Sequence, residues 1–170
     1  MGDDEAGSRT RTFGWEDPLA GGRAARTMSG LEYLRAIMRR ELPAPPIAAT
    51  LDFALTEIEE GRAVFVVEPQ EYHYNPIGVV HGGLAATLCD SAMGCAIHAT
   101  LPAGTAYTTL ELKVNYIRAL TTTTGPVRCE GKTIAVGGRV ATAEARLTDA
   151  AGTLYAHATT TCLVIRPPKG

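Results

Sequence analysis

The chain has 170 residues, 45% of them hydrophobic and 20% charged, so it is long enough for one well-cored globular domain and short for two. Its formal net charge of -2 argues against a nucleic-acid-binding protein that relies on a basic surface. The longest apolar stretch contains Asp90, two histidines and several glycines, and therefore does not predict a membrane span.

Residues 1–28 predict a poorly packed arm, partly disordered or laid against a neighbouring subunit, because few large apolar side chains occur among Gly, Arg and Asp. The arm has no hydrophobic signal region, so we expect no secretory targeting. The domain itself is expected over residues 29–170. It opens with a helix, since Ser29 and Glu32 form a capping box, and this helix should end before Pro43.

A hairpin of two strands is predicted next. Pro43–Pro46 favours a rigid connector. Alternating apolar residues over Thr50–Glu59 indicate a half-buried strand, and Arg62–Glu68 indicates the returning strand after a turn at Glu60–Gly61.

The most unusual segment is a helix predicted over about Gly82–Ala99, which is apolar nearly all round and should be buried. Histidines aside, Asp90 is the only charged residue between Glu71 and Glu111. Burying an unpaired carboxylate costs free energy, so Asp90 needs a partner or a function. It is either a core residue bonded to the backbone or to a threonine, or a general base or nucleophile.

Four more strands complete the pattern, and the turn at Gly137–Gly138 joins the second to the third. They are predicted over Ala106–Arg118, Val127–Ile134, Arg139–Leu147 and Thr153–Ile165. This order of elements favours the α+β class, with a curved antiparallel sheet wrapped around the one long apolar helix and a short N-terminal helix. The open sheet edges would be closed by pairing between subunits.

The four cysteines do not form a metal-binding or disulfide pattern. Cys89, Cys95, Cys129 and Cys162 lack C-x-x-C spacing and a companion histidine pattern. We therefore expect free thiols in a reducing cytoplasm and no metal site.

Gly82 and Gly83 stand where the first turn of the buried helix should begin. The first turn of a helix presents unpaired N–H groups and the positive end of the helix dipole, so a backbone N–H here can bind a developing oxyanion. The alternative is that both glycines only allow close packing. Asp90 lies eight residues beyond Gly82, about 12 Å along the axis, which is far for both to act on one carbonyl from the same subunit.

The motif N-P-x-G-x-x-H-G-G-x-x-x-x-L-x-D over residues 75–90 resembles the hotdog-fold acyl-CoA thioesterases of the phenylacetate-pathway (PaaI-like) and 4-hydroxybenzoyl-CoA thioesterase type. The similarity extends from about Ser29 to Ile165. It includes S-G-L-E-Y-L-R-A before the motif, and T-T-L-E-L-K-V-N-Y-I-R and R-V-A-T-A-E-A-R-L-T-D after it.

The resemblance implies a hotdog fold and hydrolysis of acyl-CoA, with an aryl or medium-chain acyl group, to the free acid and coenzyme A. It implies that the N–H of Gly82 polarises the thioester carbonyl and that Asp90 activates a water or attacks directly. It also implies sites shared across a homodimer, which we expect to form a dimer of dimers. No cofactor is expected beyond the coenzyme A of the substrate, and no nucleic acid or membrane partner.

Three further residues match positions of the family's site. Asn75 would orient the nucleophile or the thioester, or else only form an Asx turn before Pro76. His81 is expected to position the loop, with direct proton transfer as the alternative. Thr109 would hold the attacking water. Strand alternation places Thr109 opposite Leu110 and Leu112. If those two residues face the helix, Thr109 points away from it unless a bulge intervenes, and Thr108 is then the better candidate.

The coenzyme A phosphates favour basic side chains and clustered backbone N–H groups. The resemblance places the coenzyme A-binding residues near the predicted hairpin turn, at Gly137, Gly138 and Arg139.

Two other functions remain open. A hotdog hydratase or dehydratase would use a differently arranged His–acid pair, and Asp90 after H-G-G argues against it. A non-catalytic acyl-CoA sensor or binding module should lack the carboxylate at position 90.

Overall fold

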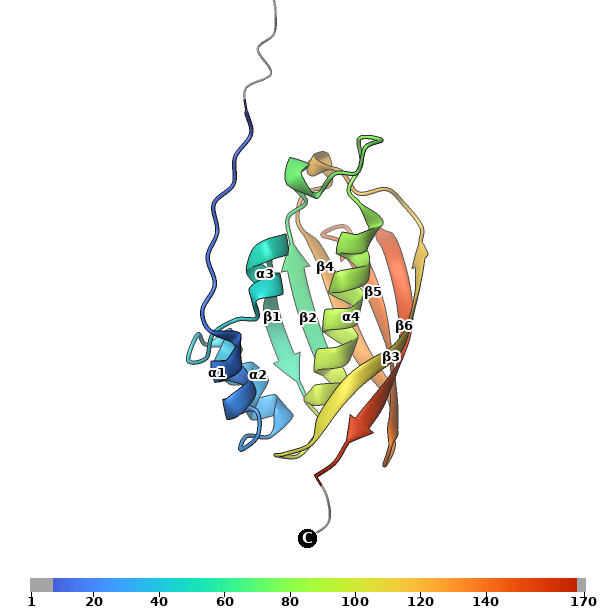
Figure 1. The fold of residues 1–170 in the computed structure, drawn as a ribbon. Helices are drawn as coiled ribbons and strands as arrows, with labels where there is room; N and C mark the ends of the chain where they lie inside the picture. Colours follow the sequence, from blue (N-terminus) through green and yellow to red (C-terminus); the bar gives the residue numbers. More distant parts are fainter. Residues whose placement is uncertain (1–7, 168–170) are drawn as a thin grey trace, which may run out of the picture.

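A computed structural model describes residues 8–167 of the chain. Figure 1 shows one long helix lying across a curved sheet, with short helices at one side. The helices are α1 Pro18–Ala24, α2 Gly30–Met38, α3 Pro46–Leu51 and α4 Gly82–His98, with single 3₁₀ turns η1 Glu71–His73 and η2 Thr122–Thr124. The strands are β1 Phe53–Glu59, β2 Arg62–Val67, β3 Ala106–Tyr116, β4 Val127–Val136, β5 Val140–Asp149 and β6 Leu154–Ile165.

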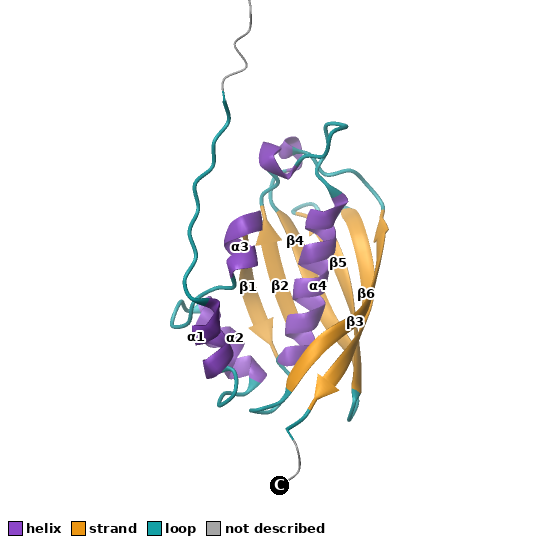
Figure 2. Cartoon of the chain, viewed as in Figure 1, coloured by secondary structure: helices purple, strands orange, loops and turns teal. Residues whose placement is uncertain are grey.

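The six strands form one sheet in the order β1-β2-β4-β5-β6-β3, and every neighbouring pair is antiparallel. The sheet curves around α4, so the helix lies on its concave face while β1 and β3 form the two edges (Figure 2). The predicted α+β architecture, a curved antiparallel sheet around one apolar helix, is confirmed.

Helix α4 is held by burial along its whole length. Leu88, Met93 and Ile97 are fully buried among side chains of the sheet. Burying a side chain of this size contributes about 1.5–3 kcal/mol relative to leaving it exposed. Gly131 on β4 brings the two backbones together, because a Cβ there would lie 2.4 Å from the carbonyl group of Ala92. The position of α4 on the sheet therefore depends on this glycine.

The start of the first strand was predicted wrongly. Residues Thr50–Asp52 do not belong to β1, and Pro46 is not part of a connector but the first turn of α3. Proline suits that position because the N–H it lacks would have no helical partner there. Thr50 donates a hydrogen bond back to the Pro46 carbonyl, and Asp52 ends the helix with a left-handed φ of 56°. The other predicted strands and the long helix agree with the structure to within two residues at each end.

The arm expected over residues 1–28 contains α1, which Asp17 caps by accepting a hydrogen bond from the Leu19 N–H. Upstream of α1, the Arg11 guanidinium donates to the Thr50 and Ala49 carbonyls at 2.7 Å. Residues 1–7 of the arm lie outside the described part of the chain. The expected capping box of Ser29 and Glu32 is present at the start of α2.

None of the helices within residues 8–167 has the length and hydrophobicity that a membrane span requires.

We predict that Gly131→Ala destabilises the fold by about 1–3 kcal/mol, because the added methyl group must separate α4 from β4. Urea unfolding followed by circular dichroism measures this change. Gly14→Ala is the matched control, since a Cβ at Gly14 meets nothing within 4 Å, and it should stay within about 0.5 kcal/mol. Equal unfolding midpoints for the two variants would contradict the close backbone contact.

Candidate active site

The loop before α4 is folded by the side chain of Asn75. Its Oδ1 accepts hydrogen bonds from the N–H groups of Ile77 at 3.0 Å and Val79 at 3.3 Å, and Gly78 supplies the positive φ of 81°. The Asx turn, the alternative role considered for Asn75, is therefore present. The side-chain nitrogen of Asn75 has no acceptor among residues 8–167, so this group remains able to donate to a ligand.

His81 is the N-cap of α4. Its Nδ1 accepts from the Gly83 N–H at 2.8 Å, and its backbone N–H donates to the His73 carbonyl at 2.8 Å. An accepting Nδ1 places the proton of the neutral ring on Nε2. A Cβ at Gly83 would lie 2.8 Å from the same Nδ1, so this glycine makes room for the cap. The geometry fits the predicted positioning role of His81.

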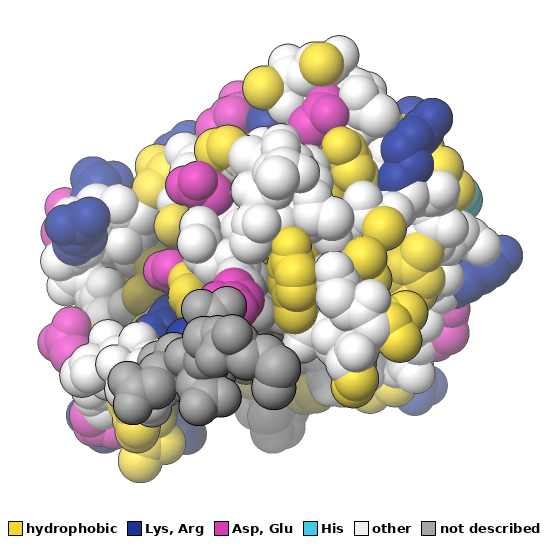
Figure 3. All heavy atoms as spheres, turned by 90° about the horizontal axis from the view of Figure 1, so that it is seen from above, with side chains coloured by type: hydrophobic (Ala, Val, Ile, Leu, Met, Phe, Trp, Pro, Cys, Tyr) yellow, Lys and Arg dark blue, Asp and Glu magenta, His cyan; other side chains and the backbone are white. Residues whose placement is uncertain are grey.

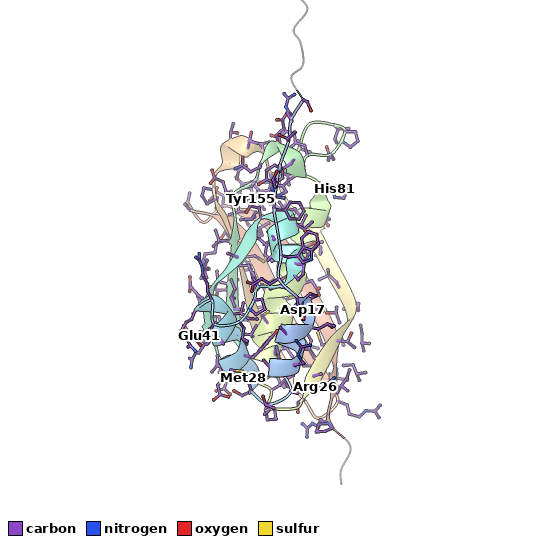
Figure 4. The ribbon with its side chains drawn as sticks, turned by 60° about the vertical axis from the view of Figure 1, so that its left-hand side comes forward. Asp17, Arg26, Met28, Glu41, His81 and Tyr155 are labelled. Atoms are coloured by element: carbon purple, nitrogen blue, oxygen red, sulfur yellow. The ribbon has the colours of Figure 1, made fainter. Side chains whose placement is uncertain are left out.

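Gly82 begins α4 with a free backbone N–H, which finds no acceptor within residues 8–167. A cavity of about 310 Å³ opens beside it, lined in part by Tyr116, Arg118 and Tyr155. The Tyr116 ring lies over Gly82, since a Cβ there would be 3.2 Å from its carbon atoms. Figure 4 shows Tyr155 and His81 at the same end of the molecule. The free N–H at the positive end of a 17-residue helix can bind a developing negative charge.

The surface around this end is mixed in character. Figure 3 views the molecule from that side and shows hydrophobic side chains scattered among polar ones. Ile77, on the loop before α4, is 83% exposed. The loop therefore presents an apolar side chain to solvent beside the free Asn75 amide.

Asp90 lies midway along α4 on the face covered by β3, where it is half-buried. The Thr109 hydroxyl donates to Asp90 Oδ1 at 2.9 Å. Oδ2 has no partner among residues 8–167. A carboxylate held at one oxygen and free at the other can take a proton from a bound water. The same bond also fits the structural interpretation of a core Asp bonded to a threonine.

The bulge that this contact requires is present. The register of β3 with β6 shifts between Thr109 and Glu111, which leaves Leu110 as the extra residue, 59% exposed. Thr109 therefore faces the helix and the exposed Thr108 faces away, so Thr109, not Thr108, lies in the site. Before the bulge the inward residues are odd-numbered, and after it they are even-numbered.

Sequence analysis overlooked Tyr116. Strand alternation alone does not indicate which side of β3 faces the helix. No feature of the sequence marks the bulge at Leu110, so only the structure shows the Tyr116 ring covering Gly82.

The predicted residues form two separate groups. Asn75, His81 and Gly82 lie at the start of α4, whereas Asp90 and Thr109 lie about 12 Å further along its axis. Gly137, Gly138 and Arg139 form the exposed turn between β4 and β5, where the Gly137 N–H donates to the Val140 carbonyl at 2.8 Å. This turn forms no hydrogen bond with either group.

No three His, Cys, Asp or Glu side chains in the described part of the chain are placed to hold a metal ion. The four cysteines are free thiols. Burial, and to a smaller extent Asp90, raises the pKa of Cys95 to about 12, so this thiol stays protonated at neutral pH.

The thioesterase superfamily matches residues 77–156. A Saccharolobus solfataricus protein named "Putative esterase" is 31% identical over 133 residues, which cover 78% of this chain and 93% of that protein. A phenylacetic acid degradation-related protein from Ralstonia eutropha JMP134 has a similar structure, with a TM-score of 0.70 and 27% identity over 77% of this chain and 98% of its own. A Streptococcus mutans UA159 protein, solved bound to acetyl CoA, has a TM-score of 0.61 and 25% identity over 69% of this chain and 91% of its own.

We predict that His81→Ala destabilises the protein by about 0.5–2 kcal/mol, because the N–H of Gly83 loses its acceptor. His81→Asn should retain most of the stability, since asparagine is among the best N-cap residues. Thermal unfolding of the three proteins at one pH tests this. A loss of the same size in both variants would show that the cap is not what His81 contributes.

Proposed function

The chain belongs to the thioesterase superfamily and is a thioester hydrolase, and we propose that its substrate is an acyl-coenzyme A with an aryl or medium-chain acyl group. The resemblance seen in the sequence is confirmed at the level of the family. The products would be the free acid and coenzyme A. The acetyl CoA bound to the similar Streptococcus mutans protein supports coenzyme A as the thiol part.

The observation that carries this proposal is the free N–H of Gly82 at the start of α4. A thioester carbonyl gains negative charge on its oxygen when a nucleophile adds to it. A backbone N–H at a helix N-terminus is already oriented toward such an oxygen, and losing one such donor costs on the order of 100-fold or more in rate. The free side-chain nitrogen of Asn75, on the adjoining loop, could donate to the same carbonyl.

Asp90 supplies the second half of the chemistry in either of two ways. As a general base it removes a proton from water, the resulting hydroxide adds to the carbonyl carbon, and the C–S bond breaks to release the thiolate, which takes up the proton. As a nucleophile its carboxylate adds to the carbonyl carbon and the C–S bond breaks to release the thiolate. Water then hydrolyses the resulting acyl-enzyme anhydride, which gives the free acid, restores the carboxylate and supplies the proton that the thiolate takes up. In both cases the Thr109 hydroxyl fixes the orientation of the carboxylate.

In the proposed dimer, the edge strands of two subunits pair and bring the Gly82 group of one subunit to the Asp90 group of the other. The open edge of β3 offers unpaired backbone groups to a second copy, and a twofold axis would pair the strand with itself. The loop and Gly82 of one subunit then meet Asp90 and Thr109 of the other, giving two sites per dimer. A dimer of dimers belongs to the same proposal.

The turn Gly137–Gly138–Arg139 is our candidate for the coenzyme A phosphates. The two glycines leave its backbone open, and the guanidinium of Arg139 can pair with a phosphate. The proposed location is the cytoplasm, where acyl-coenzyme A is made and where the four free cysteines would stay reduced.

We predict that Asp90→Asn lowers turnover by about 100-fold or more while binding of a nonhydrolysable acyl-coenzyme A analogue is retained, because shape is kept and basicity lost. Release of free thiol from a panel of acyl-coenzyme A esters measures turnover. Asp17→Asn, in the distant α1 cap, is the control and should leave turnover unchanged.

The same panel of acyl-coenzyme A esters distinguishes a hydrolase from the two alternative functions. A binding or sensor module would bind the esters without releasing thiol. A hydratase or dehydratase would add or remove water on an enoyl or hydroxyacyl ester, also without thiol release. Either result, or full turnover in Asp90→Asn, would contradict the proposed mechanism.

A further inference from the structure

The mechanism proposed above gives no function to Tyr116, although this residue lies against the start of α4. Tyr116 is the last residue of β3, and its side chain is on the helix-facing side of the strand, as are those of Leu112 and Val114. Those two side chains pack against the core, whereas Tyr116 is 56% exposed and lines the cavity beside Gly82. An exposed aromatic side chain in the wall of a cavity can contact a ligand there.

The hydroxyl end of the Tyr116 ring lies on Gly82. A Cβ on Gly82 would be 3.2 Å from Cε1 and from Cζ of the ring, and 3.4 Å from the hydroxyl oxygen. The backbone nitrogen of Gly82 is two bonds from that position, so it lies within about 6 Å of the hydroxyl oxygen. In the first turn of a helix, the Cα–Cβ bonds and the free N–H groups both point toward the N-terminal end. The hydroxyl and the N–H therefore lie on the same side of Gly82.

Both of these donors are free. The Tyr116 hydroxyl forms no hydrogen bond within residues 8–167, and the same holds for the N–H of Gly82. The second phenol in the wall of this cavity differs, since the Tyr155 hydroxyl donates to Asp149 Oδ2 at 3.3 Å. The Tyr116 hydroxyl thus remains able to donate to a ligand.

One oxygen atom can accept hydrogen bonds from both groups. A hydrogen bond spans about 2.7–3.2 Å between its donor and acceptor atoms, so an acceptor placed between two donors at this separation reaches both. The carbonyl oxygen of a thioester becomes an oxyanion when a nucleophile adds to the carbonyl carbon, and it then gains most from such donors. An oxyanion has a lone pair for each donor, so the amide of Asn75 on the adjoining loop does not compete with Tyr116.

The proposed dimer is compatible with this placement. Tyr116 and Gly82 belong to one subunit, so both donors are brought to the partner together when β3 pairs with its own copy. Antiparallel pairing sets the Tyr116 end of β3 beside the opposite end of the second strand, which carries Thr109. Thr109 in turn holds Asp90 of its own subunit. A carbonyl oxygen between Gly82 and Tyr116 therefore lies on the side from which Asp90 of the partner subunit acts.

We propose that Tyr116 is a catalytic residue, whose hydroxyl donates a hydrogen bond to the thioester carbonyl oxygen beside the N–H of Gly82. This inference rests on the proposed function. As the nucleophile adds, the electron pair of the C=O π bond moves onto the oxygen, where both donors stabilise it. The same pair forms the C=O bond again when the C–S bond breaks. The hydroxyl keeps its proton throughout, so the proton balance of the hydrolysis is unchanged.

Tyr116→Phe tests the proposal, because it removes the hydroxyl and keeps the ring on Gly82. This variant should lower kcat and kcat/KM by the same factor, about 100-fold, with KM unchanged, since the lost bond acts on the transition state. Release of free thiol from acyl-coenzyme A esters by the full chain measures both constants.

Tyr33→Phe is the matched control. Tyr33 lies on α2, where its ring packs against that of His98 at the far end of α4, with 5.6 Å between the ring centroids. Its hydroxyl also has no hydrogen-bond partner within residues 8–167. Loss of this hydroxyl should leave kcat unchanged.

A second measurement reports the hydrogen bond itself. A ketone analogue of the substrate, in which a methylene group replaces the thioester sulfur, keeps the carbonyl group and cannot be hydrolysed. Hydrogen bonds lower the infrared stretching frequency of a carbonyl group. The bound analogue should therefore have a higher carbonyl frequency in Tyr116→Phe than in the wild-type protein, and the wild-type frequency in Tyr33→Phe.

Two failures can be told apart. If the wild-type protein releases thiol and Tyr116→Phe retains its kcat, the ring only covers Gly82 and the inference is overturned. A lower kcat with an unchanged carbonyl frequency also overturns it, because the hydroxyl then does not act on the carbonyl. If the wild-type protein releases thiol from none of the esters, the proposed function itself fails.

Discussion

Because a methyl group at Gly131 would lie 2.4 Å from the Ala92 carbonyl, α4 and β4 meet backbone to backbone, and the rest of the structure follows from that contact. It holds the helix deep in the concave sheet, so that residues on nearly every side of α4 are buried. It also fixes the distance between Asp90 on α4 and strand β3, so that the Thr109 hydroxyl reaches the carboxylate. Moving the helix outward would separate Asp90 from Thr109 before it exposed much of the core.

The bulge at Leu110 shows where sequence analysis succeeds and where it stops. The buried helix, the strands and the turn residues follow from apolar periodicity, glycine and proline, and the structure agrees with them closely. A bulge has no such signal, because one extra residue leaves the composition of the strand unchanged. The sequence could only state the condition under which Thr109 would face Asp90. Helix α3 was missed because its six residues are too few to show helical periodicity, and its first proline resembled a connector.

The candidate site was predicted residue by residue but not as an arrangement. Asn75, His81 and Asp90 were found through their spacing in one motif, and the structure shows an Asx turn, an N-cap and a carboxylate held at one oxygen. Tyr116 was not singled out, since its importance comes from Gly82, across the fold, which leaves room for the ring. Contacts of this kind depend on tertiary packing that no local pattern encodes.

The central claim is that each active site combines the Gly82 N–H of one subunit with the Asp90 carboxylate of another. A mixed dimer tests this claim most directly. One tagged subunit carries Asn75→Ala and the other Asp90→Asn, each nearly inactive as a homodimer. In the mixed dimer one site combines the intact loop with the intact carboxylate, while the other site carries both changes. Purified mixed dimers should therefore recover about half of the wild-type turnover per dimer. Turnover no higher than that of the two parent homodimers would contradict the shared site.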